Sequence, residues 1–391
     1  MNILHVISTL DPEGGGPPLV VVRIAAAQAA LGHKVTVLSY ASASGQDRTT
    51  RSMDKVPNVG LVNFDFLPKR CATEAIFGRS ARARLRSLIP AVDWVHCHGV
   101  WERIIQTAAA ISVASEVPYC IRPAGMLDPW SLQQKKWKKR LALFFGYRRM
   151  LSRAAYIHAL NVDEARLIGP LGLPTPIEVV PNGVFLEEIF PLPSKGAFRK
   201  TKANLGQSPY VLFMARLHFK KGLDFLLDAF EKVAEKRQDV RLVIAGPDDG
   251  AERWIRERRN ASPYAERILL VGALYGEEKF AALVDSAVFC LPSRQEGFSV
   301  AALEALACGV PIVISKASNF PEVGLAGAGL VVELDSGEIA EGLMKVLASE
   351  RTRDEMAQAA TNLVRECYVW PQIAAHLVAH YEGYLQRGRV D

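Results

Sequence analysis

Two glutamates in the second half of the chain, Glu296 and Glu304, flank a stretch whose composition could bind an anion. Residues 288–291 before them are apolar and indicate a buried parallel strand, and residues 301–307 after Ser299 favour a helix. The backbone amides at the start of that helix, together with its dipole, would favour negative charge. A phosphate held between two carboxylates suits a ligand with sugar hydroxyls on both sides, as in a nucleotide sugar. Two solvated glutamates on a helix are the simpler alternative.

Two cations, Arg216 and Lys221, follow another apolar run at residues 210–215 and precede a predicted helix at 223–237. The guanidinium group of arginine binds phosphate as a planar fork, and the ammonium group of lysine acts as a compact point charge. Because the carboxyl ends of parallel strands meet at one edge of a sheet, we expect these cations and the two glutamates at the same edge. An ordinary basic loop is the alternative.

The N-terminal residues follow a strand–helix–strand pattern. Predicted strands at 2–8 and 35–39 enclose the turn sequence GGGPP at 14–18 and a helix at 19–31. Glycine lets backbone amides approach a phosphate closely. The turn is not G-x-G-x-x-G, which disfavours a dinucleotide site. We therefore expect a phosphate-facing loop here, with a plain turn as the alternative.

A histidine, His98, follows a predicted strand at 93–97, and the next strand, at 119–122, runs into the sequence RPAGMLDPW. The side chain of His98 would lie at the carboxyl edge of the first sheet, facing a ligand or bonded within its own loop. His96, Cys97 and His98 together could suggest a metal. No second cluster of cysteine or histidine completes a set of ligands, so no metal site is expected.

The remaining pattern indicates two α/β domains that meet near residue 185, where a Pro-Asn-Gly turn is followed by an irregular segment. In the first domain, residues 46–57 suggest a polar loop, 59–67 a third strand and 77–88 a helix. In the second domain, strands are expected at 240–245, 268–271, 311–315 and 330–332. Pro371 suits the first turn of a final helix at 372–387.

The sequence EGFSVAALEALACGVP at residues 296–311 resembles the signature of family 4 retaining glycosyltransferases, the "glycosyl transferases group 1". R-x4-KG and the PNG turn fit the same family, and HGVW with RPAGMLDPW resembles its bacterial exopolysaccharide subgroup. The resemblance implies the GT-B fold, with two Rossmann-like domains facing a central cleft and a C-terminal helix crossing back to the first domain. Residues 1–184 plus 371–391 would form an acceptor-binding domain, and 185–370 a nucleotide-sugar-binding domain.

The resemblance also implies roles for particular residues. Many relatives carry a histidine where this chain has Arg122-Pro123, which makes His98 the candidate for that role. In the family pattern, Glu296 bonds the hexose hydroxyls and Glu304 the ribose hydroxyls. The implied catalytic residues are His98, Arg216, Lys221 and Glu296. The implied donor-binding residues are Gly15, Gly16, Arg216, Lys221, Gly246, Ala273, Leu274, Glu296, Gly297, Phe298, Ser299, Val300 and Glu304.

We therefore expect a retaining hexosyltransferase that uses a nucleotide diphosphate sugar, with UDP-glucose as the favoured donor. The acceptor would be a saccharide or a lipid-linked saccharide in polysaccharide biosynthesis. A GDP-mannose-dependent mannosyltransferase, a GT-B-like nucleotide-sugar epimerase and a non-enzymatic nucleotide-sugar sensor remain alternatives. The chain contains no D-x-D motif, so neither a metal nor another cofactor is expected. The sequence does not specify the base, the hexose, the acceptor or the oligomeric state.

The composition indicates a cytoplasmic protein of 391 residues, 49% of them hydrophobic. Its six cysteines form no C-x-x-C pair and lie mostly in apolar runs, which suggests buried thiols in a reducing compartment. The chain begins directly in a strand-like run, and no apolar run reaches the length needed to span a bilayer, so neither a signal peptide nor a membrane span is expected.

The net charge is +6, and much of the excess lies in residues 131–153, which contain no acid. Aromatic and aliphatic residues alternate with the basic ones there, a combination that suits the anionic face of a membrane. The alternative is a solvated helix whose apolar side packs on its own domain. Nucleic acid is not an expected partner, because no known binding module accompanies the charge. The basic residues are Lys135, Lys136, Lys138, Lys139, Arg140, Arg148, Arg149 and Arg153.

Overall fold

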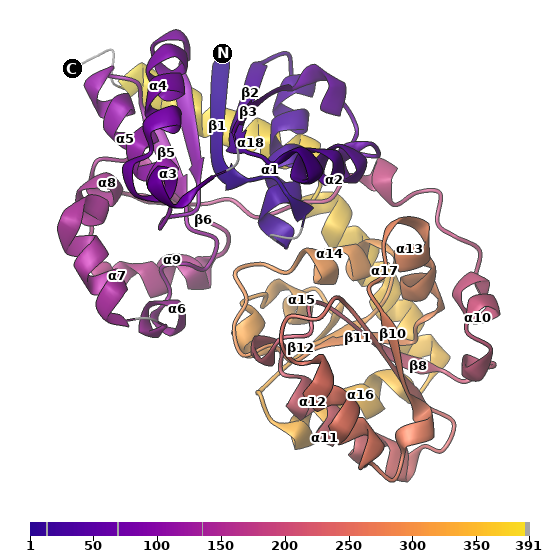
Figure 1. The fold of residues 1–391 in the computed structure, drawn as a ribbon. Coiled ribbons are helices and arrows are strands. Elements are labelled where there is room, and N and C mark those ends of the chain that lie inside the picture. Colours follow the sequence, from indigo (N-terminus) through magenta and orange to yellow (C-terminus); the bar gives the residue numbers. More distant parts are fainter. Residues whose placement is uncertain (13–14, 69, 135, 388–391) are drawn as a thin grey trace. The chain divides into compact units, whose positions relative to one another are not determined.

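The computed structural model describes residues 1–12, 15–68, 70–134 and 136–387, and the chain divides into two compact units (Figure 1). Unit 1 contains Met1–Glu188 and the C-terminal segment from Trp370 onward, and unit 2 contains Ile189–Val369. Each unit is built on a parallel sheet with helices between its strands, so the expected pair of Rossmann-like domains is confirmed.

The sheet of unit 1 has the strand order β3-β2-β1-β4-β5-β6-β7, and its neighbouring strands are parallel. The order reverses between β1 and β4, which makes this pair the topological switch point, where ligands of such sheets bind. The strands are β1 Asn2–Thr9, β2 Lys34–Tyr40, β3 Asn63–Leu67, β4 Trp94–His98, β5 Tyr119–Arg122, β6 Tyr156–Ala159 and β7 Ile177–Val179.

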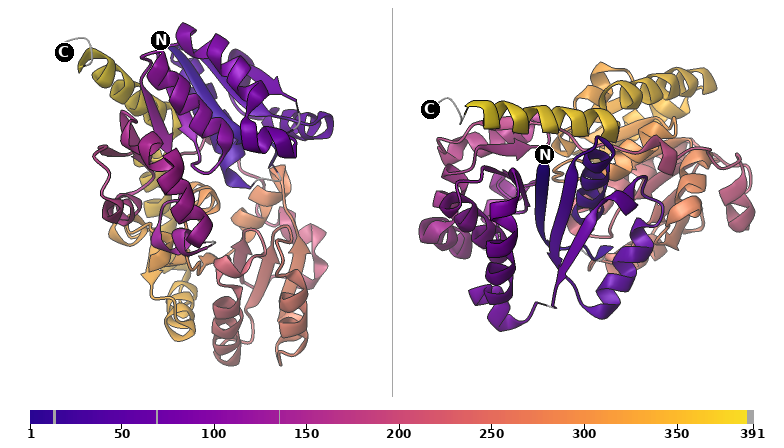
Figure 2. Two further views of the ribbon diagram at one scale, coloured as in Figure 1. Left: turned by 60° about the vertical axis from the view of Figure 1, so that its left-hand side comes forward. Right: turned by 90° about the horizontal axis from the view of Figure 1, so that it is seen from above.

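The helices of unit 1 lie on both faces of its sheet (Figures 1 and 2). Val95 and Cys97 of β4 pack in one core cluster with residues of α5, whereas His96 points the other way and contacts α18. This alternation follows from the two-residue period of a strand. The helices are α1 Gly16–Ala30, α2 Ala43–Met53, α3 Ala72–Phe77, α4 Arg79–Leu88, α5 Arg103–Ala114, α6 Pro129–Gln133, α7 Lys136–Ala142, α8 Arg148–Ser152, α9 Val162–Ile168 and α18 Trp370–Arg387, with a π-type segment η4 Leu143–Tyr147.

The last helix, α18, belongs to unit 1 although the residues just before it belong to unit 2. It packs against α1, and Tyr381 near its middle is fully buried. The expectation that the terminal helix returns to the first domain is confirmed. The helix begins at Trp370, with Pro371 in its first turn.

The sheet of unit 2 has the strand order β10-β9-β8-β11-β12-β13, again with parallel neighbours. Its switch point lies between β8 and β11. The strands are β8 Tyr210–Met214, β9 Arg241–Ala245, β10 Ile268–Gly272, β11 Val288–Leu291, β12 Ile312–Ser315 and β13 Gly329–Val332. The helices are α10 Ala197–Thr201, α11 Leu223–Lys236, α12 Glu252–Asn260, α13 Gly276–Asp285, α14 Val300–Ala307, α15 Glu322–Leu325, α16 Ser336–Leu347 and α17 Glu350–Cys367.

Several local expectations for unit 1 were wrong. The expected polar loop at 46–57 is mostly helix α2, whose N-terminus is capped by Ser42 through a hydrogen bond from the amide of Gly45. The helix expected at 77–88 is α4, which begins at Arg79 after Gly78 in the left-handed region at φ 58°, and the preceding helix α3, Ala72–Phe77, was not expected. The third strand begins only at Asn63, after a short 3₁₀ turn.

Two expectations from composition can be compared with the structure. Cys97, Cys120, Cys290 and Cys308 are buried as expected, but Cys71 and Cys367 are exposed. In the part of the chain that the structure describes, none of the helices has both the length and the apolar character to cross a bilayer.

Candidate active site

A buried ion pair joins the two strands at the switch point of unit 2. Lys221 ends the short turn that follows β8, and Glu296 follows β11. The Nζ atom of Lys221 lies 2.6 Å from Oε1 of Glu296, and their side chains are only 15% and 9% exposed. The structure thus brings together a cation and an acid separated by 75 positions in the chain.

The surroundings of Glu296 keep it ionised. Burial by itself raises the pKa of this carboxyl group, but the charge of Lys221 and the hydrogen bonds from Lys221 and Ser293 outweigh it. The pKa of Glu296 therefore lies below its ordinary value. The Ser293 hydroxyl donates to Oε1 at 2.5 Å. At neutral pH Glu296 accepts hydrogen bonds and does not donate them.

Backbone contacts hold both members of this pair in place. The amide of Glu296 donates to the carbonyl of Ala317 at 3.1 Å, and Asn319 Nδ2 donates to the carbonyl of Glu296 at 2.9 Å. On the other side, Gly222 follows Lys221 with φ 68°, and a Cβ atom there would lie 1.8 Å from the carbonyl oxygen of Pro292. Only glycine lets the two strand-end loops approach this closely.

The second predicted cation, Arg216, lies at the same strand end but is half exposed. Its Nη1 atom donates to Asp249 Oδ2 at 2.7 Å. The backbone beside it is tightly packed, since a Cβ on Gly246 would lie 1.8 Å from the carbonyl oxygen of Ala215. An exposed ion pair of this kind contributes little to stability, so Arg216 can exchange Asp249 for a phosphate at small cost.

The helix after Glu296 begins where the sequence predicted. Ser299 is the N-cap of α14, and its hydroxyl accepts the amide of Ala302 at 3.2 Å. Phe298 is buried against Phe320 and Tyr368, which fixes the loop just before the helix. Gly297 lies in this loop, and Val300 is the first residue of α14.

The second glutamate of the signature, Glu304, lies one turn into α14 and is 7% exposed at its side chain. Its Oε1 atom lies 2.7 Å from Nζ of Lys279 on α13. Lys279 was not among the predicted residues, because no helix was expected at residues 276–285. The amphipathic pattern of GEEKFAALVD was the signal that could have revealed this helix.

The residues expected near a nucleobase follow the neighbouring strands. Gly246 comes directly after β9, and its amide donates to the carbonyl of Gly272 at 2.8 Å. Ala273 and Leu274 come directly after β10, the first half-buried and the second buried. All the residues predicted in the second domain therefore lie at or just beyond the carboxyl edge of one sheet.

The residues predicted in the first domain flank the switch point of unit 1. Gly15 caps α1 in the left-handed region at φ 88°, and Gly16 is the first residue of the helix, followed by Pro17 and Pro18 in its first turn. A Cβ on Gly16 would meet no atom within 4 Å. Gly14 of the same turn lies outside the described residues.

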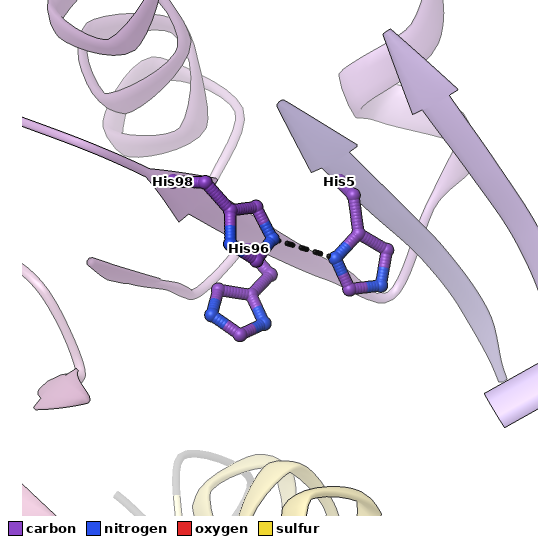
Figure 3. A group of neighbouring side chains, drawn as sticks. All are labelled: His5, His96 and His98. Atoms are coloured by element: carbon purple, nitrogen blue, oxygen red, sulfur yellow. Dashed lines mark hydrogen bonds between the residues drawn. The ribbon is translucent and has the colours of Figure 1, made fainter. Parts of the chain in front are cut away.

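His98 ends β4 and belongs to a buried cluster of imidazole rings that includes His5 and His96 (Figure 3). Its Nε2 atom lies 2.9 Å from Nδ1 of His5, and its ring stacks on His96 with centroids 4.1 Å apart. His158 of β6 extends the cluster, with Nδ1 3.2 Å from Nε2 of His96. Sequence reasoning missed His5 and His158 because they lie on other strands.

The hydrogen bonds of this cluster form one directed chain. His158 Nε2 must donate to the carbonyl oxygen of Val180 at 2.7 Å, so Nδ1 of the neutral ring accepts from His96 Nε2. His96 Nδ1 in turn accepts from the hydroxyl of Tyr381 at 2.8 Å. That hydroxyl oxygen accepts from Gln28 Nε2 at 3.2 Å. Each step fixes the tautomer of the next group.

The chain continues through Gln28 to His98. Gln28 Oε1 accepts from His5 Nε2 at 2.7 Å, which leaves His5 Nδ1 to accept from His98 Nε2. The remaining atom, His98 Nδ1, is buried and has no hydrogen-bond partner among the described residues. It therefore carries a lone pair that can accept a hydrogen bond.

Burial and neighbouring charges keep these rings neutral. The pKa of His5 is lowered to about 4 and that of His158 to about 3, by burial first and by the charge of the Arg122 guanidinium to a smaller extent. The pKa values of His96 and His98 are lowered well below the ordinary value for the same first reason. Arg122 is itself buried and donates to Asn182 Oδ1 at 2.6 Å.

The cluster also has the outline of a metal site. One ligand atom from each of His5, His96 and His98 lies within 4.8 Å of the others. A metal would have to displace protons from the chain described above, next to the fixed positive charge of Arg122. The hydrogen bonds account for the other ring nitrogens of the four histidines without an ion, so we assign none.

Two family descriptions match most of the chain between them. "Glycosyl transferases group 1" matches residues 194–363, and "Glycosyl transferase 4-like domain" matches residues 15–183. The two matched ranges correspond closely to the two units of the structure.

Curated relatives are similar over about half to two thirds of the chain. A phosphatidyl-myo-inositol mannosyltransferase of Mycobacterium leprae is 31% identical over 66% of this chain and 62% of its own length. An MMP alpha-(1->4)-mannosyltransferase of Mycolicibacterium hassiacum is 33% identical over 64% of this chain and 61% of its own length. The chain thus matches less than two thirds of the length of these relatives.

Solved structures share the fold over nearly the whole chain. Anabaena HepE in complex with UDP and glucose superposes with a TM-score of 0.78 at 16% identity, covering 98% of this chain and 100% of that one. Sucrose-phosphate synthase from Thermosynechococcus elongatus gives 0.77 at 17% identity, with 99% and 100% covered. These likenesses confirm the architecture of two Rossmann-like domains.

Proposed function

Because the chain belongs to the glycosyl transferases of group 1, we propose that it transfers a hexose from a nucleotide diphosphate sugar to a saccharide or lipid-linked saccharide acceptor. The transfer would retain the anomeric configuration and serve polysaccharide biosynthesis. The observation that carries this proposal is the buried Lys221–Glu296 pair at the switch point of unit 2. In this pair Lys221 is a cation that could bind a phosphate, and Glu296 is an ionised acid that could accept hydrogen bonds from sugar hydroxyls.

The proposed chemistry needs positive charge where the leaving group forms. When the bond between the sugar and its phosphate breaks, the electron pair stays on the phosphate oxygen. Arg216, Lys221 and the amides at the start of α14 would stabilise that charge, and preorganised groups of this kind usually supply a large part of the rate enhancement. The departing phosphate oxygen would accept the proton of the attacking hydroxyl on the same face of the sugar.

The remaining predicted residues would bind the rest of the donor. Glu296 would accept hydrogen bonds from hexose hydroxyls and Glu304 from ribose hydroxyls. Gly246, Ala273 and Leu274 would line the place of the base. The backbone at Gly297, Phe298, Ser299 and Val300 would face the diphosphate.

Residues of unit 1 would serve the donor diphosphate and the acceptor. Gly15 and Gly16 begin α1, where amides favour an anion. His98 would accept a hydrogen bond from a sugar hydroxyl through Nδ1, the one nitrogen that the histidine chain leaves without a partner among the described residues.

The donor has two candidates. UDP-glucose is favoured by the exopolysaccharide resemblance, and GDP-mannose is favoured by the mannosyltransferases among the curated relatives. Isothermal calorimetry with UDP-, GDP-, ADP- and dTDP-sugars would identify the donor. Failure of every nucleotide sugar to bind would contradict the proposal.

The Glu296→Gln variant tests the site directly. It removes charge-assisted hydrogen bonds worth about 1.5–3 kcal/mol each, so kcat/KM for transfer should fall by about tenfold to a hundredfold. Glu355→Gln on α17 removes an exposed glutamate paired with Arg351 and should leave kcat/KM unchanged. Equal activity of the two variants would show that the site is wrong.

We also propose that transfer needs no metal ion, since Arg216 and Lys221 supply the positive charge that an ion would otherwise provide. Protein treated with EDTA and dialysed should keep its transfer rate. A rate restored only by Mg²⁺ or Mn²⁺ would refute this part of the proposal.

The protein would act at the cytoplasmic membrane face, with residues 131–153 near the bilayer. In the described part of this segment, Trp137 is 75% and Leu141 is 56% exposed, as a membrane contact requires. Lys139 is turned inward, with its Nζ atom bonded to the carbonyl of Ser131 at 2.6 Å. Lys135 lies outside the described residues.

A further inference from the structure

An arginine-lined groove lies on the surface of unit 1 and includes the end of the basic segment at 131–153. Its floor is α5, and α4, η4 and α8 form its walls. The groove has a volume of about 700 Å³. Its cationic residues are Arg82 and Arg86 of α4, Arg103 of α5, Arg149 of α8 and Arg153 just after α8.

These arginines lack the acids that usually accompany them. Among the described residues no aspartate or glutamate lines the groove, and none of the five arginines forms an ion pair. Arg103 donates from Nη1 to Oε1 of Gln106, while its Nε atom is buried and has no hydrogen-bond partner within the described chain. The groove therefore holds five positive charges with no compensating acid in its walls.

The spacing of the arginines concentrates this charge. Arg82 and Arg86 are four residues apart on α4, and Arg149 and Arg153 are four apart at α8, so each pair shares one helix face. Like charges at this spacing destabilise a helix. On α12 of unit 2 the residue four positions from an exposed arginine is instead an acid, as in Arg253–Glu257 and Arg256–Glu252.

Two arginines on the same helices that do not line the groove have hydrogen-bond partners, and a third, Arg79, lies over the ring of Phe77. Arg84 of α4 bonds Asp65 at 2.6 Å, and Arg148 of α8 bonds the carbonyls of Leu171 and Gly172 at 2.8 and 2.9 Å. Among the described residues, Arg82, Arg86, Arg149 and Arg153 of the groove have neither a hydrogen bond nor an ion pair from their side chains. This distribution suits an external anion.

The groove also offers apolar surface. Its floor and walls include Ala110, Ile111, Val113 and Met150. The two helices that pack beside it carry large exposed apolar residues. Ile76 and Phe77 of α3 are 64% and 52% exposed, and Trp137 and Leu141 of α7 are 75% and 56% exposed. Arginines can bind lipid phosphates, and exposed aromatic and aliphatic residues on the adjacent helices can enter the interfacial region of a bilayer. This combination is therefore complementary to an anionic membrane surface.

We infer that this groove binds the phosphate of an anionic lipid head group and holds unit 1 against the membrane. The guanidinium groups would bind the phosphate oxygens in pairs, and the apolar residues of α3 and α7 would enter the interfacial region. The inference deepens the membrane contact of the proposed function and names its ligand and its residues.

Vesicle cosedimentation of the full chain tests the inference. Vesicles of phosphatidylcholine alone are compared with vesicles of equal parts phosphatidylcholine and phosphatidylglycerol. Each variant replaces two arginines with glutamine and so removes two positive charges. The groove variants are Arg82→Gln/Arg86→Gln and Arg149→Gln/Arg153→Gln, and the control is Arg253→Gln/Arg256→Gln in unit 2.

The wild type and the control should bind the anionic vesicles and not the neutral ones. The groove variants should bind about tenfold to thirtyfold more weakly, since each basic residue near an anionic surface contributes about fivefold. Their unfolding midpoints should not fall, because each loses a like-charge pair. Nucleotide-sugar binding, to which none of the groove arginines is assigned, should be unchanged and reports on the proposed function separately.

Three results would overturn the inference. The control variant could weaken vesicle binding as much as the groove variants do, which would indicate diffuse electrostatics. Inorganic phosphate or a short RNA at low concentration could release the protein from the vesicles, which would indicate a soluble phosphate or nucleic-acid site. The wild type could bind both kinds of vesicle equally, which would show that the head group is not recognised.

Discussion

At the scale of single residues, the candidate donor site depends on two glycines as much as on its charged groups. Gly222 lets the loop that carries Lys221 pass against the carbonyl oxygen of Pro292, close to Glu296. Gly246 does the same beside Arg216, against the carbonyl oxygen of Ala215. Both close contacts bring a loop after one strand against the end of its neighbour. The distance between the cation and the acid is therefore set by the backbone.

Gly222→Ala should weaken donor binding as well as lower the unfolding free energy. The loss of unfolding free energy should exceed the cost of placing alanine at a positive φ. A methyl group would lie 1.8 Å from the Pro292 oxygen, so the loop must move and carry Lys221 with it. Gly327→Ala is the matched control, because Gly327 has φ 71° and open space around its Cβ position. The control should lose about 1–2 kcal/mol of unfolding free energy and keep donor affinity.

The Gly222→Ala variant should lose more unfolding free energy than the control and also bind the donor more weakly. Urea unfolding and donor calorimetry measure the two effects. If both variants bind the donor equally well, the close approach at Gly222 does not position Lys221.

The sequence allowed the charged residues to be predicted where their spacing is local. Glu296 and Glu304 lie on one strand–loop–helix unit, so seven intervening residues determine their relation. Lys279, Asp249 and His5 could not be found in this way. Each of these residues contacts its partner only because strands or helices that are distant in sequence pack together. A short sequence motif does not predict which distant elements become neighbours.

At the scale of elements, the helix α18 is attached to the first sheet by a polar contact inside an otherwise apolar interface. The hydroxyl of Tyr381 donates to His96 and accepts from Gln28 of α1. Its ring stacks on Trp94 with centroids 4.7 Å apart. A single residue of the C-terminal helix thus connects a strand and the first helix of the chain.

Tyr381→Phe should destabilise unit 1 by about 1–3 kcal/mol, because it leaves His96 Nδ1 and Gln28 Nε2 buried without partners. Tyr384→Phe on the same helix removes only a 3.2 Å bond to the partly exposed Glu178 and should cost less. Tryptophan fluorescence can follow the unfolding, since Trp94 is buried against this helix. Equal losses in the two variants would contradict the directed chain of hydrogen bonds.

Prediction of elements from the sequence succeeded where apolar runs are continuous. The core strands of both sheets were located because parallel strands are buried on both faces. The polar helix α2 was missed because it has few apolar residues and is defined by its Ser42 cap. The helix α3 was missed because its six residues are too few to show a helical period, and Gly78 separates it from α4, which was predicted.

At the scale of the whole molecule, the two units differ in how the positive charges on their surfaces are compensated. In unit 2 most exposed arginines form ion pairs with acids. At its switch point, the cations Arg216 and Lys221 are also paired with acids. Unit 1 leaves arginines uncompensated along one groove. The proposed donor site therefore belongs to unit 2, where surface arginines are mostly paired with acids. The proposed membrane contact belongs to unit 1, where the arginines of the groove have no acid partners among the described residues.

The stability of the molecule should depend on pH because unit 1 buries four neutral histidines. The folded pKa values of His5 and His158 lie at about 4 and about 3, below the ordinary value of 6.5 that applies to the unfolded chain. Between pH 6.5 and 5 the unfolded state binds protons that the folded state does not. Stability is therefore fully present above pH 6.5 and falls as the pH decreases, by about 1.4 kcal/mol per pH unit for each histidine.

Other groups contribute as well. Burial raises the pKa of Glu164 and that of Glu102, which opposes the loss, whereas the hydrogen bonds to Glu74 outweigh its burial and lower its pKa to about 2, which adds to the loss. Urea unfolding at pH 7, 6 and 5 measures the sum of these contributions, and a histidine variant isolates the share of one ring. The His158→Gln variant should reduce the slope by one histidine's share. A free energy of unfolding that stays level over this range would mean that the buried rings are protonated in the folded state, and the single direction of the hydrogen-bond chain would then be lost.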